Sequence, residues 1–138
     1  MPSLFTEDTY EQAIIELFEN MGYDHLYAPD LDRDYSSPLL DAELRNSLVR
    51  INRGLPVEAI DEALSKLKNF DTGSLLQKNI IFMDYLQNGI TVKLFVKGEE
   101  QSSIVRLIDY TNEKSNSFYV VNQFTFLENG NNRRPDVI

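Results

Sequence analysis

Apolar residues in the first ninety positions recur at the spacing of amphipathic helices. The first stripe falls at i, i+3, i+4, i+7, i+8 and i+11, and it predicts a helix that ends at Gly22. Three more helices are predicted: one begins at Ser37–Pro38, one begins at Pro56, and one runs from Leu75 to about Gln87. The residues expected to face the core are Tyr10, Ala13, Ile14, Leu17, Phe18 and Met21 in the first helix, and Leu40, Leu44, Leu48, Ile51, Val57, Ile60, Leu64 and Leu67 in the next two.

Glu11 lies at the edge of the first apolar stripe, and two interpretations stay open for it. Asp8 followed three residues later by Glu11 fits a capping box, which makes Glu11 a cap residue. At about 100° per residue, Glu11 also lies beside Phe18, so its carboxylate can instead point toward a site next to the core. The sequence pattern by itself favours the cap.

The segments between the helices are polar. Residues 23–37 are expected to form an acidic, solvated loop, and His25, the only histidine, is expected on its surface. Asp30, Asp32 and Asp34 have the opening spacing of a calcium loop, but Tyr35 stands where that loop needs a glycine, so an EF-hand is not expected. Residues 71–74 are expected to form a turn.

After residue 89 the hydrophobic pattern changes to period two. Ile90, Val92, Leu94 and Val96 alternate with polar residues and predict a strand. Three further strands are predicted over residues 103–110, 118–127 and 133–138, and short turns between them favour an antiparallel meander packed against helices. The expected fold class is therefore α/β in an α+β arrangement, a single domain over residues 1–138 with helices in 1–89 and a largely antiparallel or mixed sheet in 90–138.

Two polar residues interrupt the apolar strand predicted over residues 118–127. Strict alternation puts Asn122 on the face of Phe118 and Val120, and Gln123 on the opposite face. The simpler interpretation is that they satisfy backbone groups at a bend. The alternative is that Asn122 and Gln123 position Asp136 or a metal-bound water.

Composition restricts the class of protein. The 138 residues carry a net charge of -9, and residues 1–50 hold eleven acidic against three basic residues, so we do not expect this chain to grip nucleic acid strongly by itself. The absence of cysteine slightly favours an intracellular protein, and no secretory signal or membrane-spanning apolar run is recognisable. A cytoplasmic location without membrane contact is the resulting prediction.

The residue types leave carboxylate chemistry as the main candidate. There is no cysteine, no serine in an elbow motif and no glycine-rich phosphate loop. Asp136 follows Pro135 and precedes two β-branched residues, which puts a carboxylate at the mouth of a predicted strand. An unpaired carboxylate there is costly, so we expect it to have a partner or a metal ion.

Several of these features together resemble a known family. A first helix with Glu11, the segment Met21-Gly22-Tyr23, a helical insert, and then LIDY, FYVVNQFTF and RRPDVI are similar to the N-terminal nuclease domain of the R subunit of type I restriction–modification enzymes. The resemblance implies a restriction-endonuclease-like fold of the PD-(D/E)XK class. It also implies that Pro135-Asp136 is the first half of the motif, that Glu11 and Asp136 are catalytic metal ligands, and that Gln123 assists them.

The resemblance carries further expectations for the full-length protein. It implies Mg²⁺-dependent hydrolysis of double-stranded DNA, an ATP-driven motor that translocates DNA, and partnership with methylase and specificity subunits. The sequence departs from the motif because no Glu-X-Lys follows Asp136 within the 138 residues, so the isolated chain is expected to be an inactive fragment with an incomplete sheet. The alternative function is a non-catalytic, acidic module for protein–protein interaction.

Overall fold

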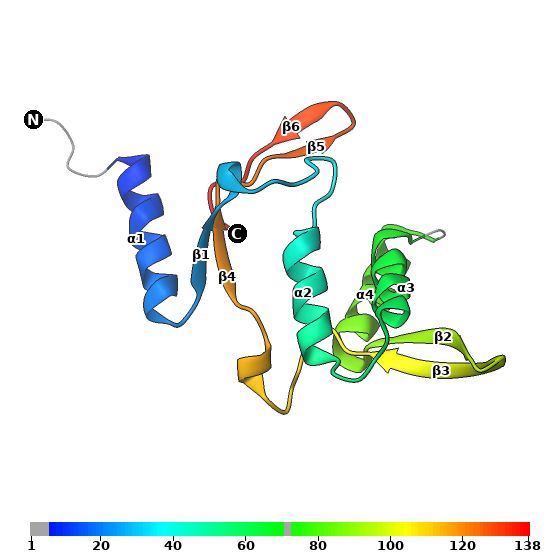
Figure 1. The fold of residues 1–138 in the computed structure, drawn as a ribbon. Helices are drawn as coiled ribbons and strands as arrows, with labels where there is room; N and C mark the ends of the chain where they lie inside the picture. The colour runs from blue at the N-terminus through cyan, green and yellow to red at the C-terminus, as the bar shows by residue number, and fades with distance from the viewer. Residues whose placement is uncertain (1–5, 71–72) are drawn as a thin grey trace, which may run out of the picture. The chain divides into compact units, whose positions relative to one another are not determined.

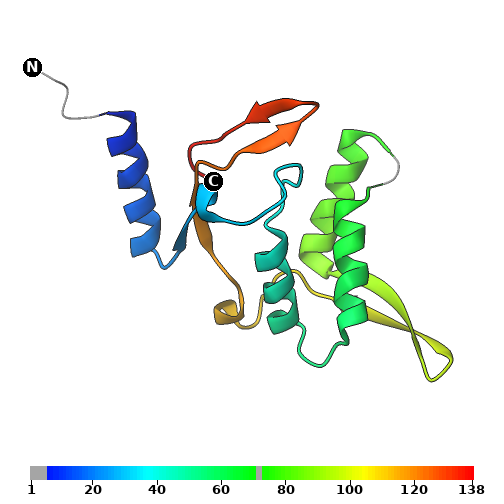
Figure 2. The same cartoon turned by 45° about the horizontal axis from the view of Figure 1, so that its top comes forward.

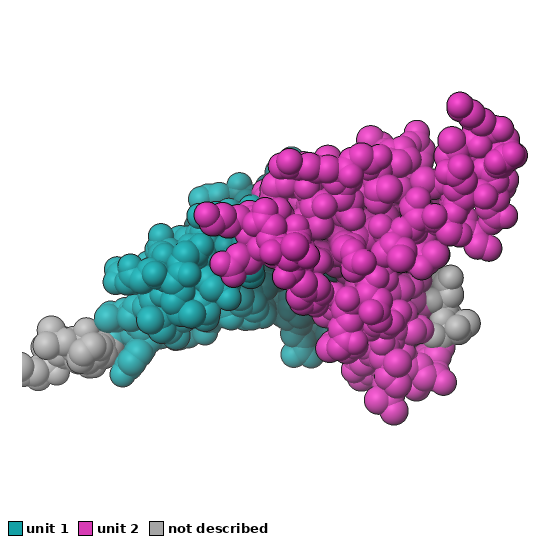
Figure 3. All heavy atoms as spheres, turned by 90° about the horizontal axis from the view of Figure 1, so that it is seen from below, with its two compact units in different colours: residues 1–41, 117–138 teal, residues 42–116 magenta. Residues whose placement is uncertain are grey.

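A computed structural model describes residues 6–70 and 73–138; of the turn predicted over residues 71–74, the first two positions lie outside this range. The described chain forms two compact units, coloured in Figure 3. Unit 1 comprises residues 1–41 and 117–138, and unit 2 comprises residues 42–116. Four α-helices among the described residues, together with both parallel and antiparallel strand pairs, confirm the α+β class.

Unit 1 is built on a parallel pair of strands that are far apart in the sequence. β1 (Asp24–Tyr27) pairs with β4 (Tyr119–Asn122) in the register His25 to Val120 and Tyr27 to Asn122. Helix α1 (Glu7–Asn20) lies beside both strands (Figure 1). The prediction of a loop over residues 23–37 is therefore wrong for β1 and for the short 3-10 helix η1 (Ala28–Asp30).

The face of α1 that packs inward differs from the prediction. Glu11 and Ile15 are buried, whereas Tyr10, Leu17 and Met21 are 61, 58 and 64% exposed. Thr6 is the N-cap, and its side-chain oxygen accepts a hydrogen bond from the Thr9 amide, so the capping box predicted from Asp8 and Glu11 is wrong. The helix end before Gly22 is confirmed.

The two faces of the β1–β4 pair have different surroundings. Residues on one face, including Val121 and Leu26, join an apolar cluster with Ala28 and Phe124. The other face carries His25 and Asn122 near α1. One sheet pair therefore separates a small hydrophobic core from a polar site.

The chain after β4 forms shorter pairings than the strands predicted over residues 118–127 and 133–138. β5 (Phe126–Glu128) and β6 (Asn131–Arg133) make an antiparallel hairpin. The last residues then return to β4: Ile138 and Val121 exchange both backbone hydrogen bonds at 2.8 Å, and Asn122 bridges to Val137.

Unit 2 packs helices against a second hairpin (Figure 2). It contains α2 (Asp41–Ile51, apart from its first residue), α3 (Val57–Lys68), α4 (Leu75–Asn88), β2 (Ile90–Val96), β3 (Glu99–Val105) and the 3-10 helix η2 (Glu113–Ser115). Its core joins Leu48 of α2, Ile60 and Leu67 of α3, and Ile90 and Val92 of β2. These inward residues of α2, α3 and β2 confirm the periodicity-based predictions for them. Val57 is exposed, and α2 begins at Asp41 rather than at Ser37–Pro38, so the prediction is wrong for Leu40, which packs in the cluster of unit 1.

The strand arrangement corrects the predicted meander. β2 pairs with β3 through a turn at Lys97 and Gly98, so residues 99–102, expected in the turn before the strand predicted over 103–110, already belong to β3. The described strands form three separate two-stranded sheets. Within the described residues, no helix has the length and apolar character needed to cross a membrane.

Candidate functional site: a buried carboxylate held by two amides

Glu11 is a charged residue in a position normally taken by a core residue. It lies one turn before the buried Ile15 on the side of α1 that meets β1 and β4, and only 8% of its surface is exposed. It forms no ion pair with any described residue. Burying a carboxylate is unfavourable unless hydrogen bonds replace its hydration, so its partners decide whether the charge is tolerated.

Two side-chain amides supply those hydrogen bonds. Asn122 Nδ2 donates to Glu11 Oε1 at 2.7 Å, and Gln123 Nε2 donates to Glu11 Oε2 at 3.0 Å. Each carboxylate oxygen thus receives one N–H group and keeps further acceptor capacity. The Glu11 carboxylate therefore points inward next to the core, as the second interpretation expected, and its role as a site residue stays a prediction.

Gln123 reaches Glu11 because the strand ends at Asn122. Gln123 has φ of 55°, in the left-handed region, so the alternation of faces stops there. Neighbouring side chains that would point to opposite faces of a strand therefore converge on one carboxylate, and the prediction that Asn122 and Gln123 face opposite ways is wrong. Nothing in the sequence marks this turn, because left-handed backbone usually coincides with glycine or asparagine.

His25 extends the arrangement from β1. Its Nε2 lies 2.7 Å from Asn122 Oδ1, and the residue is half-buried. The prediction of a surface histidine is therefore wrong. Its position follows from the parallel register, since Tyr27 is the residue opposite Asn122 and His25 lies two positions earlier, on the same face.

These side chains line an open pocket of about 480 Å³. Its walls come from α1, β1 and the end of β4, and its polar lining includes a second carboxylate; the residues are Asp8, Glu11, Gln12, His25, Tyr27, Asn122 and Gln123. A carboxylate held by neutral donors beside open space is suited to binding a cation or to accepting a proton from a bound molecule.

Asp136 is the other predicted ligand. It lies next to Gln123 through a backbone contact, but it does not line this pocket. Its side chain is exposed, and its backbone carbonyl accepts a hydrogen bond from the Gln123 amide at 2.9 Å. Gln123 thus contacts Glu11 with its side chain and Asp136 with its backbone. The roles of Glu11, Gln123 and Asp136 in catalysis stay predictions.

The described residues fit part of a magnesium site rather than a complete one. Carboxylate oxygens are suitable Mg²⁺ ligands, and the Glu11 oxygens retain free acceptor capacity. Within residues 6–70 and 73–138, however, no three His, Asp or Glu side chains are grouped closely enough to hold a metal ion. Further ligands would have to come from outside the described residues or from water.

The fold and the site define an α+β protein with an amide-held carboxylate at an open pocket. The family model for the type I restriction enzyme R protein N terminus matches residues 4–138, and the chain belongs to this family. It is 28% identical over 144 residues to the type I restriction enzyme HindI endonuclease subunit of Haemophilus influenzae, an alignment that covers 98% of this chain and 14% of that protein.

A second relative gives a similar result. The chain is 31% identical over 137 residues to the putative type I restriction enzyme MjaIXP endonuclease subunit of Methanocaldococcus jannaschii, with 93% of this chain and 13% of that protein covered. The chain therefore spans about one seventh of the length of these curated relatives. No solved structure gives a significant match.

Proposed function

We propose that this chain is the N-terminal part of a DNA-cleaving R subunit and that unit 1 contributes to its nuclease centre. The observation that carries the proposal is the Glu11 carboxylate, which is buried, has no counter-ion among the described residues and is held by two amides at an open pocket. Family membership supports the nuclease class, since both relatives are named as endonuclease subunits. We further propose the PD-(D/E)XK class, with a restriction-endonuclease-like fold, for the complete domain.

In this proposal, Glu11 and Asp136 are ligands of Mg²⁺. When bound, Mg²⁺ activates water and neutralises charge on the scissile phosphate. Asn122 and Gln123 hold the Glu11 carboxylate in one orientation, so that its free lone pairs face the pocket. Gln123 also links the two acids, because its backbone amide donates to the Asp136 carbonyl.

The remaining activities belong to the full-length protein and are proposed for it. They are ATP-driven translocation of double-stranded DNA and assembly with methylase and specificity subunits in the cytoplasm. The net charge of -9 favours a DNA grip supplied by other parts of that protein. We expect residues 1–138 alone to show no cleavage of plasmid DNA in Mg²⁺, and nicking that depends on Glu11 would contradict this.

The proposal is tested in the full-length subunit with its partner subunits. Glu11→Gln keeps the size of the side chain but removes its charge, and Asp136→Ala removes the second ligand. Each is expected to lower plasmid cleavage by at least about 100-fold while ATP hydrolysis stays near the wild-type rate, because the motor lies elsewhere.

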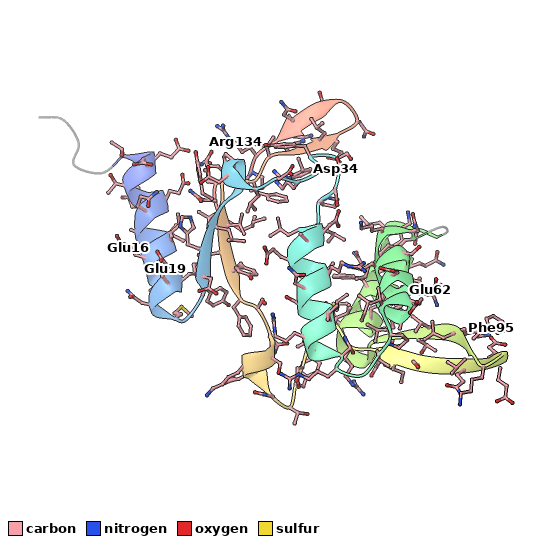
Figure 4. All side chains as sticks on the ribbon, in the orientation of Figure 1. Glu16, Glu19, Asp34, Glu62, Phe95 and Arg134 are labelled. Atoms are coloured by element: carbon pink, nitrogen blue, oxygen red, sulfur yellow. The ribbon has the colours of Figure 1, made fainter. Side chains whose placement is uncertain are left out.

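Glu16→Gln is the matched control. Glu16 is an exposed glutamate on the same helix, labelled in Figure 4, so this variant makes the same chemical change away from the pocket. Wild-type cleavage by Glu11→Gln would remove Glu11 from the catalytic centre. A loss of cleavage in Glu16→Gln equal to that in Glu11→Gln would point to a general charge effect instead.

A further inference from the structure

We propose that His25 is a positioning residue that fixes the Glu11 carboxylate through Asn122. The inference rests on the proposed function, because it assigns a role at the same centre. Three side chains from three elements form a continuous line: His25 Nε2 lies 2.7 Å from Asn122 Oδ1, and Asn122 Nδ2 lies 2.7 Å from Glu11 Oε1. Asn122 is 4% exposed and Glu11 is 8% exposed, so water does not readily replace either partner.

The charge on Glu11 sets the direction of every hydrogen bond in this line. An ionised carboxylate only accepts, so the amide nitrogen of Asn122 must face Glu11 and the amide oxygen must face His25. The imidazole must then donate from Nε2. The carboxylate itself excludes the reversed amide, and His25 is the group that anchors the oxygen end of the Asn122 amide in the remaining orientation.

Without His25, the amide oxygen of Asn122 loses its partner, and the amide keeps only its hydrogen bond to Glu11. Glu11 would keep Gln123, but that amide stands on a residue with φ of 55° at the end of β4, where the strand pairing with β1 has stopped. His25 is inside the paired strand, opposite Val120, and its backbone position is fixed by that register. His25 thus supports the carboxylate, through Asn122, from a residue inside the paired strands.

The test uses three substitutions of His25 in the full-length subunit with its partner subunits. The amide nitrogen of Gln lies about as far along the side chain as Nε2 of His, whereas the amide nitrogen of Asn corresponds to Nδ1 and falls short. We expect His25→Ala and His25→Asn to lower plasmid cleavage about 10- to 100-fold, the range found when a partner of a metal ligand is lost. His25→Gln should recover most of the wild-type rate.

Two further measurements separate positioning from general damage to the fold. The Mg²⁺ concentration that gives half-maximal cleavage should rise in His25→Ala, while ATP hydrolysis in the same titration stays near wild type. The double variant His25→Ala/Asn122→Ala should cleave no more slowly than Asn122→Ala alone, because His25 acts through Asn122. Asp24→Asn, an exposed change on the same strand, is the control.

Failure of this inference is distinguishable from failure of the proposed function. If Glu11→Gln cleaves normally, the nuclease role of Glu11 is wrong. The positioning role of His25 is then tested separately by hydrogen exchange. Exchange of residues 7–20 should become faster in His25→Ala and should stay unchanged in His25→Gln. The role of His25 would be overturned if His25→Gln and His25→Ala gave the same cleavage rate and the same hydrogen exchange. It would also be overturned if the losses of cleavage in His25→Ala and Asn122→Ala added up in the double variant.

Discussion

Asn52 holds two segments of unit 2 together with a hydrogen-bond pattern that resembles a strand pair. Its Nδ2 donates to the Arg106 carbonyl at 2.8 Å, and its Oδ1 accepts from the Arg106 amide at 2.7 Å. Nδ2 also donates to the Leu48 carbonyl at 2.9 Å, and Asn52 is 8% exposed. One side chain therefore satisfies both backbone groups of a residue 54 positions later.

The cost of Asn52→Ala follows from which groups lose their partners. The Leu48 carbonyl keeps the Asn52 backbone amide at 3.0 Å, so only the two Arg106 groups are orphaned. Each buried unsatisfied group costs about 1–3 kcal/mol, and the exposure of Arg106 puts each of the two near the lower end of that range, at about 1–1.5 kcal/mol. Asn52→Ala should therefore lower the free energy of local opening by about 2–3 kcal/mol. This corresponds to an increase of about 30- to 150-fold in the population of the open state.

Hydrogen exchange measured by mass spectrometry on the full-length protein can test this value. Peptides covering residues 42–55 and 104–108 should exchange about 30- to 150-fold faster in Asn52→Ala, provided that exchange is limited by local opening. Asn69→Ala is the matched control, because Asn69 makes the same bond to the carbonyl four residues earlier, at Ser65, but is exposed. It should change exchange by about five-fold or less. Equal effects of the two variants would refute the reasoning from orphaned groups.

Two other features predict the direction of a change in stability. In thermal unfolding of the full-length protein, Gly89→Ala should destabilise unit 2 far more than Gly54→Ala. Both glycines have positive φ, but a Cβ at Gly89 would meet a β3 carbonyl oxygen at 2.7 Å, whereas a Cβ at Gly54 would meet open space. Backbone hydrogen bonds from Asn112 and then Thr111 lower the pKa of Asp109. The stabilisation that these hydrogen bonds give is present at pH values above the ordinary pKa of 3.8, and it is lost as the pH falls through the lowered pKa. Asp109→Asn should therefore remove this acid sensitivity from the hydrogen exchange of residues 109–116. An unchanged pH dependence in that variant would assign the sensitivity to other groups.

Local patterns predicted the elements whose structure is decided locally. The helical spacing of Ile60 and Leu67 identified α3, the alternation after Ile90 identified β2, and both are packed in the core of unit 2. A glycine also marked the end of α4, where Gly89 has a φ of 81°. These signals work because each depends on residues within a few positions of one another.

The candidate site depends on contacts that no local pattern specifies. The parallel pairing of β1 with β4 joins residues 95 positions apart, as in His25 with Val120, and the four residues of β1 do not alternate in polarity. The turn that brings Gln123 onto Glu11 occurs without a glycine. The visible signals were the polarity of Asn122 and Gln123 inside an apolar strand and the place of Glu11 beside an apolar stripe, and they indicated unusual positions without giving the partners.

The orientation of α1 is the strongest argument that the pocket is functional. Burial of the stripe that contains Tyr10, Leu17 and Met21 would require a rotation of roughly 100° about the helix axis. The helix instead directs Glu11 inward, and leaves these three large side chains more than half exposed. A helix packed only for the stability of the described residues would bury its apolar side, since apolar burial is the main favourable contribution to folding. Departure from the local apolar pattern is expected at sites that carry chemistry. Here the departure centres on a carboxylate that two amides hold, one of which is hydrogen-bonded to His25.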